Sequence, residues 1–212
     1  MSQASLFILI FVLLNSIQIR AQASSDSDTD AQNPATKDDY KLRRGSKEFG
    51  AWGVGSFDAP TPIGSNHRPI AMLGLRYGRI VGTNHLGTLS YVADIIPIQI
   101  AFNQPDEQGI RRNVYGVGIN YGGVKVSYLR RSRVKPFAGG SGGLVFYTRR
   151  VPLEGRKLNV TYSLDAGLDI FTGRKQAITV AYKFYHASDA ISRKANIGTN
   201  DNMISVGFSL FK

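Results

Sequence analysis

A histidine and a serine lie two residues apart near the end of the chain, at His186 and Ser188. In an extended strand, residues at positions i and i+2 project from the same face, so this spacing makes the imidazole and the hydroxyl neighbours. A neutral imidazole that takes the proton of a serine hydroxyl creates a nucleophile that can attack an ester. The pair is therefore compatible with an esterase, but most pairs with this spacing are structural or solvated, and the surrounding residues must decide.

The residues before this pair alternate between large apolar side chains and small or polar ones. His186 and Ser188 share a face with Ile178, Val180, Tyr182 and Phe184. If this face met the acyl chains of a bilayer, unpaired polar groups on it would be costly without a purpose. We therefore expect the two side chains on a lipid-facing wall, within reach of a substrate that lies in the membrane.

An alternation with a period of two recurs from Lys47 onward and predicts strands rather than helices. Eight such segments can be counted, at 47–57, 69–81, 85–97, 113–129, 134–148, 158–171, 177–187 and 202–211. Short turns and longer loops alternate between them, which, with the even number of strands, is typical of an outer-membrane β-barrel. Closure is required there because hydrocarbon offers no partner to an open strand edge.

A soluble eight-stranded barrel, with its apolar face inward, has the same alternation. Two features favour the membrane form. The more polar face is rich in Gly, Ala, Ser and Thr with an occasional Asp or Lys, which suits the filled interior of a small barrel. Aromatic residues lie near segment ends, as in interfacial girdles, at Phe49, Trp52, Tyr77, Tyr128, Tyr147, Phe171, Tyr185 and Phe211. We therefore expect an all-β fold, an eight-stranded antiparallel transmembrane β-barrel of the bacterial outer membrane.

The N-terminal residues predict export. A nine-residue apolar run from Leu6 to Leu14 is too short to span a bilayer as a helix, and it is followed by the small-x-small pattern Ala21-Gln22-Ala23. We interpret residues 1–23 as a signal peptide. Residues 24–46 are polar and nearly free of large apolar side chains, so we expect a flexible polar leader. The barrel domain is predicted at 47–212, in the bacterial outer membrane after cleavage of the signal peptide.

The chain is basic, with 26 Lys+Arg against 15 Asp+Glu and a formal net charge of +11. On the barrel prediction, many cations lie in the outer loops, at Arg111, Arg112, Arg149, Arg150, Arg156, Lys157, Arg193 and Lys194. Such a rim would attract the phosphates of lipopolysaccharide, although loop charges also serve simply to keep loops solvated. We expect outer-membrane lipids as partners and no nucleic acid. The absence of cysteine excludes disulfides and thiolate metal ligands.

A second serine motif has a different interpretation. Residues 139–143 match Gly-x-Ser-x-Gly, the nucleophile elbow of many hydrolases. That elbow requires a strand before it and a helix after it, whereas Leu144 and the residues that follow continue as strand. We therefore interpret these glycines as small residues of the barrel wall.

The residues around the histidine and serine, Tyr182 to Ala190 and then Asn196-Ile197-Gly198-Thr199-Asn200, resemble the lipid A 3-O-deacylase (PagL) family. The motif of that family is an aromatic strand entering His-x-Ser-Asn-Ala/Gly, then a short loop with Asn-Pro-Gly before a final strand. Segments at 48–53, 94–98 and 135–143 are similar to relatives described as acyloxyacyl hydrolases. The resemblance covers most of residues 47–211, and its C-terminal motif is the specific part.

This resemblance implies a carboxylic ester hydrolase that removes the 3-O-linked 3-hydroxyacyl chain from the lipid A of lipopolysaccharide, without a metal or cofactor. By motif position, Ser188 is the nucleophile and His186 the base. The acidic partner of the histidine falls on Asn200, and the Asn that contributes to the oxyanion hole falls on Asp189. The backbone amide near Ala190 is a further candidate oxyanion donor.

Both departures from the family pattern weaken the expected catalysis. Asn200 can orient the histidine but brings no charge to stabilise an imidazolium. Asp201 is an alternative acid, although a shift of one residue turns a side chain to the other face of a strand. The carboxylate of Asp189 would repel an oxyanion. An impaired enzyme is therefore one outcome that the sequence allows, and a non-catalytic barrel that anchors or supports the envelope is the alternative function. A homodimer is left open.

Overall fold

The computed structural model describes residues 40–57, 69–153, 155–189 and 198–212. They form eight strands: β1 (Lys47–Phe57), β2 (Ile70–Thr83), β3 (Gly87–Pro105), β4 (Arg111–Tyr128), β5 (Val134–Tyr147), β6 (Leu158–Gly173), β7 (Gln176–Ser188) and β8 (Thr199–Phe211). The predicted signal peptide and residues 24–39 of the predicted leader lie outside the described residues. The described part of the chain contains no helix that is long and apolar enough to cross a bilayer.

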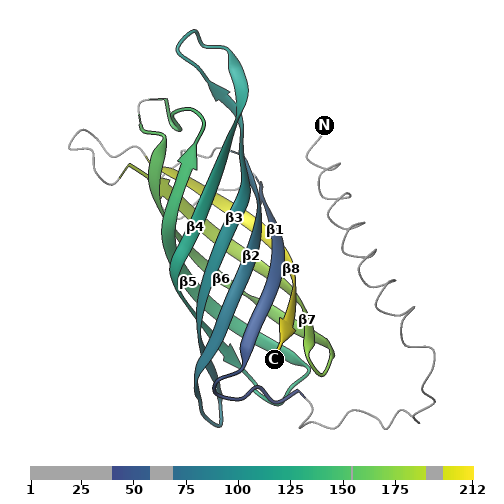
Figure 1. The fold of residues 1–212 in the computed structure, drawn as a ribbon. Coiled ribbons are helices and arrows are strands. Elements are labelled where there is room, and N and C mark those ends of the chain that lie inside the picture. The colour runs from purple at the N-terminus through teal and green to yellow at the C-terminus, as the bar shows by residue number, and fades with distance from the viewer. Residues whose placement is uncertain (1–39, 58–68, 154, 190–197) are drawn as a thin grey trace, which may run out of the picture. The chain divides into compact units, whose positions relative to one another are not determined.

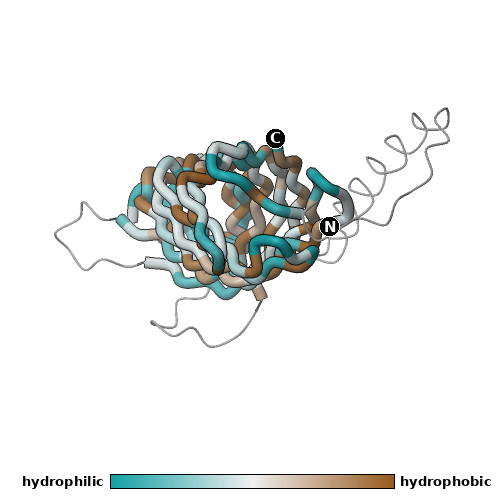
Figure 2. Tube along the Cα trace, turned by 90° about the horizontal axis from the view of Figure 1, so that it is seen from below, coloured by the Kyte–Doolittle hydropathy of each residue, from teal (hydrophilic) through white to brown (hydrophobic). Residues whose placement is uncertain are grey.

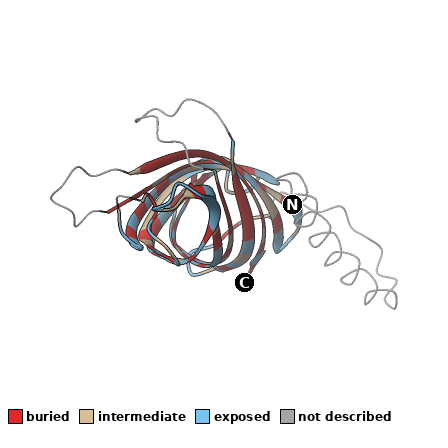
Figure 3. Ribbon diagram, turned by 90° about the horizontal axis from the view of Figure 1, so that it is seen from above, coloured by how far each residue is buried: buried red, intermediate tan, exposed pale blue. Residues whose placement is uncertain are grey.

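Each strand pairs antiparallel with its neighbour in sequence, and β1 pairs with β8 to close a barrel (Figure 1). Trp52 of β1 lies opposite Gly207 of β8. At the end of this β1–β8 pairing, the backbones of Lys47 and Lys212 form hydrogen bonds to each other. Views along the barrel from its two ends show the closed ring (Figure 2 and Figure 3). Closure pairs the backbone N–H and C=O groups of the edge strands within the barrel. The closed eight-stranded barrel confirms the fold expected from the alternation.

The two faces of the wall differ as a membrane barrel requires. Large apolar side chains are exposed on the outside of all eight strands, among them Phe49, Leu75, Ile95, Ile119, Leu164, Val180 and Ile204. Charged residues of the same strands are buried, among them Glu48, Asp94, Lys125, Asp169 and Lys183. A soluble barrel would place these two sets the other way round. The soluble alternative is therefore excluded by the direction in which the side chains point.

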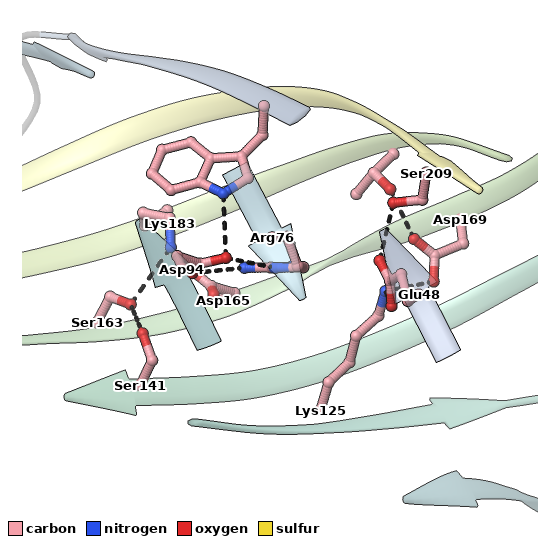
Figure 4. Close-up of polar contacts among 12 residues, drawn as sticks. Glu48, Arg76, Asp94, Lys125, Ser141, Ser163, Asp165, Asp169, Lys183 and Ser209 are labelled. Carbon is pink, nitrogen blue, oxygen red and sulfur yellow. Dashed lines mark hydrogen bonds and ion pairs between the residues drawn. The ribbon is translucent and has the colours of Figure 1, made fainter. Parts of the chain in front are cut away.

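Two clusters of ionic side chains fill the barrel interior (Figure 4). In the first, the Arg76 guanidinium donates to both carboxylate oxygens of Asp94, at 2.8 and 3.1 Å, and the Trp52 indole N–H donates to the same carboxylate at 3.2 Å. The Lys183 ammonium lies 2.6 Å from Asp165 and 5.6 Å from the centre of the Trp52 ring. Buried charges persist when they are paired and hydrogen-bonded, as these are.

The second cluster lies around the ammonium of Lys125. It is 2.7 Å from Asp169 and 3.7 Å from Glu48, and the Ser209 hydroxyl donates to Glu48 at 2.8 Å. The Thr179 hydroxyl donates to Asp169 at 2.8 Å. These contacts join β1, β4, β6, β7 and β8 across the interior and fill the barrel with side chains rather than leaving a wide pore.

The positions of several aromatic residues correct the girdle expected from the sequence. Phe49, Tyr77 and Tyr128 do lie exposed on the outside of the wall. The others predicted there are buried, namely Trp52, Tyr147, Phe171, Tyr185 and Phe211. They occupy the inward parity of their strands, so proximity to a strand end was not sufficient to predict an interfacial position.

Residues 40–46, the described part of the predicted leader, pack against one end of the barrel. Leu42 is buried in an apolar cluster with Ile80, Phe171, Ala177 and Phe211. The Gly45 N–H donates to the Ile80 carbonyl at 2.8 Å, and the Ile80 N–H donates to the Ser46 carbonyl at 2.9 Å. The barrel end that carries both the start of β1 and the C-terminus is therefore covered by this segment.

Two strands extend three or more residues beyond their predicted bounds. β3 continues to Pro105 rather than ending at 97, and β8 begins at Thr199 rather than at 202. In β3, register shifts lie between Ile96 and Gln99 and between Ala101 and Gln104. Each bulge breaks the period of two, so the alternation fades although the pairing with β4 continues. The polar start of β8 resembles a loop in composition.

Candidate functional site

The candidate site lies where β6, β7 and β8 reach the end of the barrel opposite the chain's C-terminus. Tyr162, His186 and Asn200 are opposite one another across these three strands. The His186 Nδ1 atom is 2.6 Å from the Asn200 side-chain oxygen. An amide oxygen only accepts hydrogen bonds, so Nδ1 carries the proton and donates it. This leaves the Nε2 lone pair available to accept a proton, which a general base needs.

Two further contacts fix the plane of the imidazole. The Tyr162 ring stacks on it with a centroid distance of 4.6 Å and an interplanar angle of 26°. Gly198 lies against its edge, where an added Cβ would stand 2.4 Å from Cε1 and 3.0 Å from Nε2. Neither contact of the histidine was predicted from the sequence. The ring is thus held by β6 on one side and by the residue before β8 on another.

Ser188 is on the same wall of the barrel as His186, as the spacing predicted. It pairs with Val160 of β6 and is only 6% exposed, whereas the imidazole is half-buried. Within the described residues, the Ser188 hydroxyl makes no hydrogen bond to the imidazole. Catalytic contacts in unliganded enzymes are often long or poorly aligned and shorten only when the substrate binds.

The carboxylate that follows the serine is paired with a cation. Asp189 Oδ2 lies 3.3 Å from Nε of Arg156, which belongs to the connection between β5 and β6. The Asp189 side chain is buried and that of Arg156 is more than half exposed. From the sequence alone, Asp189 is an uncompensated anion beside the predicted nucleophile; in the structure, Arg156 compensates its charge. Ala190, the other predicted oxyanion residue, lies outside the described residues.

Asp201, the alternative acid, points away from the histidine. It is fully buried, and it lies opposite Tyr185 of β7, whose side chain is also inside the barrel. Asn200 and Asp201 therefore occupy opposite faces of β8, as the pleat of a regular strand requires. The structure brings Asn200 to the imidazole and places Asp201 in the interior.

Replacement of Gly198 by alanine is expected to slow any reaction that uses His186 as its base about a hundredfold, because the new methyl group would displace the imidazole, and misplacement by about 1 Å is enough for such a loss. The rate is measured on detergent-solubilised wild-type and variant barrels. Gly173→Ala is the matched control, since a Cβ there meets nothing within 4 Å. Equal rates for the two variants would show that the position of the ring does not limit the reaction.

The closed barrel, its apolar exterior and its ionic interior define an outer-membrane β-barrel protein. A family model described as lipid A 3-O-deacylase (PagL) matches residues 87–209, which run from the start of β3 almost to the end of β8. The chain therefore belongs to the lipid A 3-O-deacylase (PagL) family, which confirms the resemblance seen in the sequence.

Solved structures with the same architecture include three crystal structures. The outer membrane enzyme PagL is 16% identical, with 77% of this chain and 98% of that chain covered and a TM-score of 0.49. The outer membrane protein OprG from Pseudomonas aeruginosa is 10% identical over 82% and 98%, also with a TM-score of 0.49. Neisserial surface protein A (NspA) is 11% identical over 78% and 95%, with a TM-score of 0.44. No curated protein sequence matches the chain.

Proposed function

We propose that the protein is an outer-membrane esterase that removes the 3-O-linked 3-hydroxyacyl chain from lipid A. The observation that carries the proposal is the 2.6 Å contact between His186 and Asn200 on the outer wall, beside Ser188, in a chain of the lipid A 3-O-deacylase family. Membership of the family supports the substrate and the ester chemistry. The contact supports the assignment of roles, because it leaves Nε2 as the basic nitrogen.

In the proposed reaction, the Ser188 oxygen attacks the carbonyl carbon of the ester while His186 Nε2 takes the hydroxyl proton. The tetrahedral intermediate collapses, the bond to the sugar oxygen breaks, and the imidazolium returns its proton to that oxygen. Water then attacks the acyl-serine with His186 again as base, and the 3-hydroxy fatty acid leaves. Asn200 holds the productive tautomer throughout, and Arg156 neutralises Asp189 beside the developing oxyanion.

The proposed orientation brings the site to its substrate. Three short connections, 84–86, 129–133 and 174–175, lie at the end that carries the C-terminus, and such turns are periplasmic in barrels of this class. The opposite end, with His186 and Ser188, would then lie at the outer leaflet, where lipopolysaccharide resides. Cleavage of residues 1–23 as a signal peptide and a periplasmic leader at 24–46 complete this proposal.

The test is to express the full-length chain in a bacterium whose lipid A keeps its 3-O-acyl chain. Mass spectra of the extracted lipid A are expected to lose the mass of one 3-hydroxyacyl group. Cells that carry the empty vector provide the control. Unchanged lipid A, with the barrel present in the outer-membrane fraction, would contradict the proposal and leave the non-catalytic barrel as the function.

A further inference from the structure

A polar cavity lies outside the candidate site, at the same end of the barrel. It has a volume of about 350 Å³ and lies between the tip of the β3–β4 hairpin and the connection from β5 to β6. Figure 1 shows this hairpin extending past the neighbouring strands. Four cations line the cavity against two carboxylates, those of Asp106 and Glu107, and the cations are Arg112, Arg149, Arg150 and Lys157.

The carboxylate of Asp106 is already engaged by the backbone of the hairpin. Its Oδ1 accepts from the N–H groups of Gln108 and Ile110, at 3.1 and 2.8 Å. Its Oδ2 lies 3.8 Å from both Arg112 and Arg149, which is long for an ion pair. Asp106 therefore serves mainly to close the turn, and it neutralises the two guanidinium groups only weakly.

Arg149 presents a donor that no described residue satisfies. Its Nη2 atom is buried and makes no hydrogen bond within the described part of the chain. Among the same residues, Arg150 and Lys157 form no ion pair. A buried guanidinium nitrogen without an acceptor is costly, and a forked guanidinium fits the oxygens of a phosphate. The cavity thus combines excess positive charge with a donor that has no acceptor among the described residues. Both features favour an anionic ligand.

The cavity is connected to the candidate site through a short stretch of backbone. Lys157 lines it, and the Lys157 carbonyl accepts from the N–H of Tyr147 at 2.8 Å. The preceding residue is Arg156, which pairs with Asp189 next to Ser188, and its carbonyl accepts from the Asn159 amide at 3.1 Å. An anionic group held in the cavity would therefore lie on the same connection that contacts the nucleophile's neighbour.

We propose that this cavity binds a phosphate monoester on the headgroup of lipid A and so anchors the glycolipid at the outer end of the barrel. The proposal rests on the proposed function only in taking lipid A as the source of the phosphate. Arg149 and Arg150 provide the principal donors, and Lys157 contributes charge. Asp106 closes the turn of the β3–β4 hairpin, which forms the other side of the cavity.

Binding is measured on the full-length chain carrying Ser188→Ala, in phospholipid nanodiscs, with lipid A that carries both phosphates and with the same lipid A after removal of both. Arg149→Gln with Arg150→Gln is expected to weaken binding of the phosphorylated lipid about tenfold or more, since charge-assisted hydrogen bonds are lost. Arg43→Gln with Arg44→Gln removes the same charge from exposed residues at the other end of the barrel and is expected to leave the affinity unchanged.

Three results would overturn the proposal: equal affinities for the two double variants, equal binding of the phosphorylated and dephosphorylated lipids, and displacement of the lipid by inorganic phosphate at matched concentration. The last would assign the cavity to free phosphate rather than to a lipid. Because Ser188→Ala is used throughout, binding is independent of hydrolysis. Intact lipid A in cells expressing the wild-type chain would contradict the proposed function and leave the binding result unaffected.

Discussion

Ser188→Ala and His186→Ala are each expected to slow release of the 3-hydroxy fatty acid about a thousandfold or more, and the double variant is expected to be no slower than either. The serine without its base is a weak nucleophile, and the base without the serine has no hydroxyl to activate. The loss is therefore shared rather than additive. The measurement is the initial rate of fatty-acid release from lipid A by purified barrels.

The matched control for the histidine is His85→Ala. His85 lies between β2 and β3, at the opposite end of the barrel, and it is exposed. Its removal is expected to leave the rate unchanged. If the double variant showed the product of the two single losses, the two residues would act in separate steps, and the proposed proton transfer between them would be refuted.

The fold was predictable because the physical signal repeats along the chain. A strand whose side chains alternate between lipid and interior must alternate in the sequence, as Ala177–His186 does. The prediction was wrong about strand length where this signal is interrupted. The outer half of β3 contains two bulges and Pro97, and Asn103 has a positive φ of 52°, so pairing with β4 persists without a regular period.

The candidate site was only partly predictable for a related reason. The His-x-Ser pair is a local pattern, and so is its distance from Asn200. The stacking of Tyr162 on His186 depends on the register between β6 and β7, which shifts at a bulge between Phe171 and Gly173. A shift of one residue would have turned Tyr162 to the interior. The sequence does not show this bulge, so it could not predict the contact.

The ion pair of Arg156 and Asp189 was even harder to predict from the sequence, because it joins a loop to a strand end that is distant in sequence. The local sequence pattern of neither segment predicts this contact. This contact reduces the main objection to the proposed catalysis, which is the anion beside the proposed nucleophile, because a guanidinium at 3.3 Å offsets the charge of that carboxylate.

Arg156→Ala is expected to slow hydrolysis about a hundredfold, because it removes the guanidinium that offsets the buried carboxylate of Asp189, next in the chain to Ser188, where the proposed oxyanion forms. Asp189→Asn in the same chain is expected to restore most of the rate, since the neutral amide removes the repulsion and can donate a hydrogen bond. The rates of the four proteins in this double-mutant cycle are measured on lipid A under identical conditions.

The size of the coupling energy between the two substitutions decides between two roles for Arg156. If it acts by neutralising Asp189, the second substitution rescues the first, and the coupling is large. If Arg156 instead contacts the substrate directly, Asp189→Asn cannot replace that contact, and Arg156→Ala remains slow in either background. Added salt is a further discriminator, because the exposed guanidinium is screened by salt while the buried carboxylate is screened much less. A rescue that survives high salt would assign the effect to the buried carboxylate and not to steering of the anionic lipid.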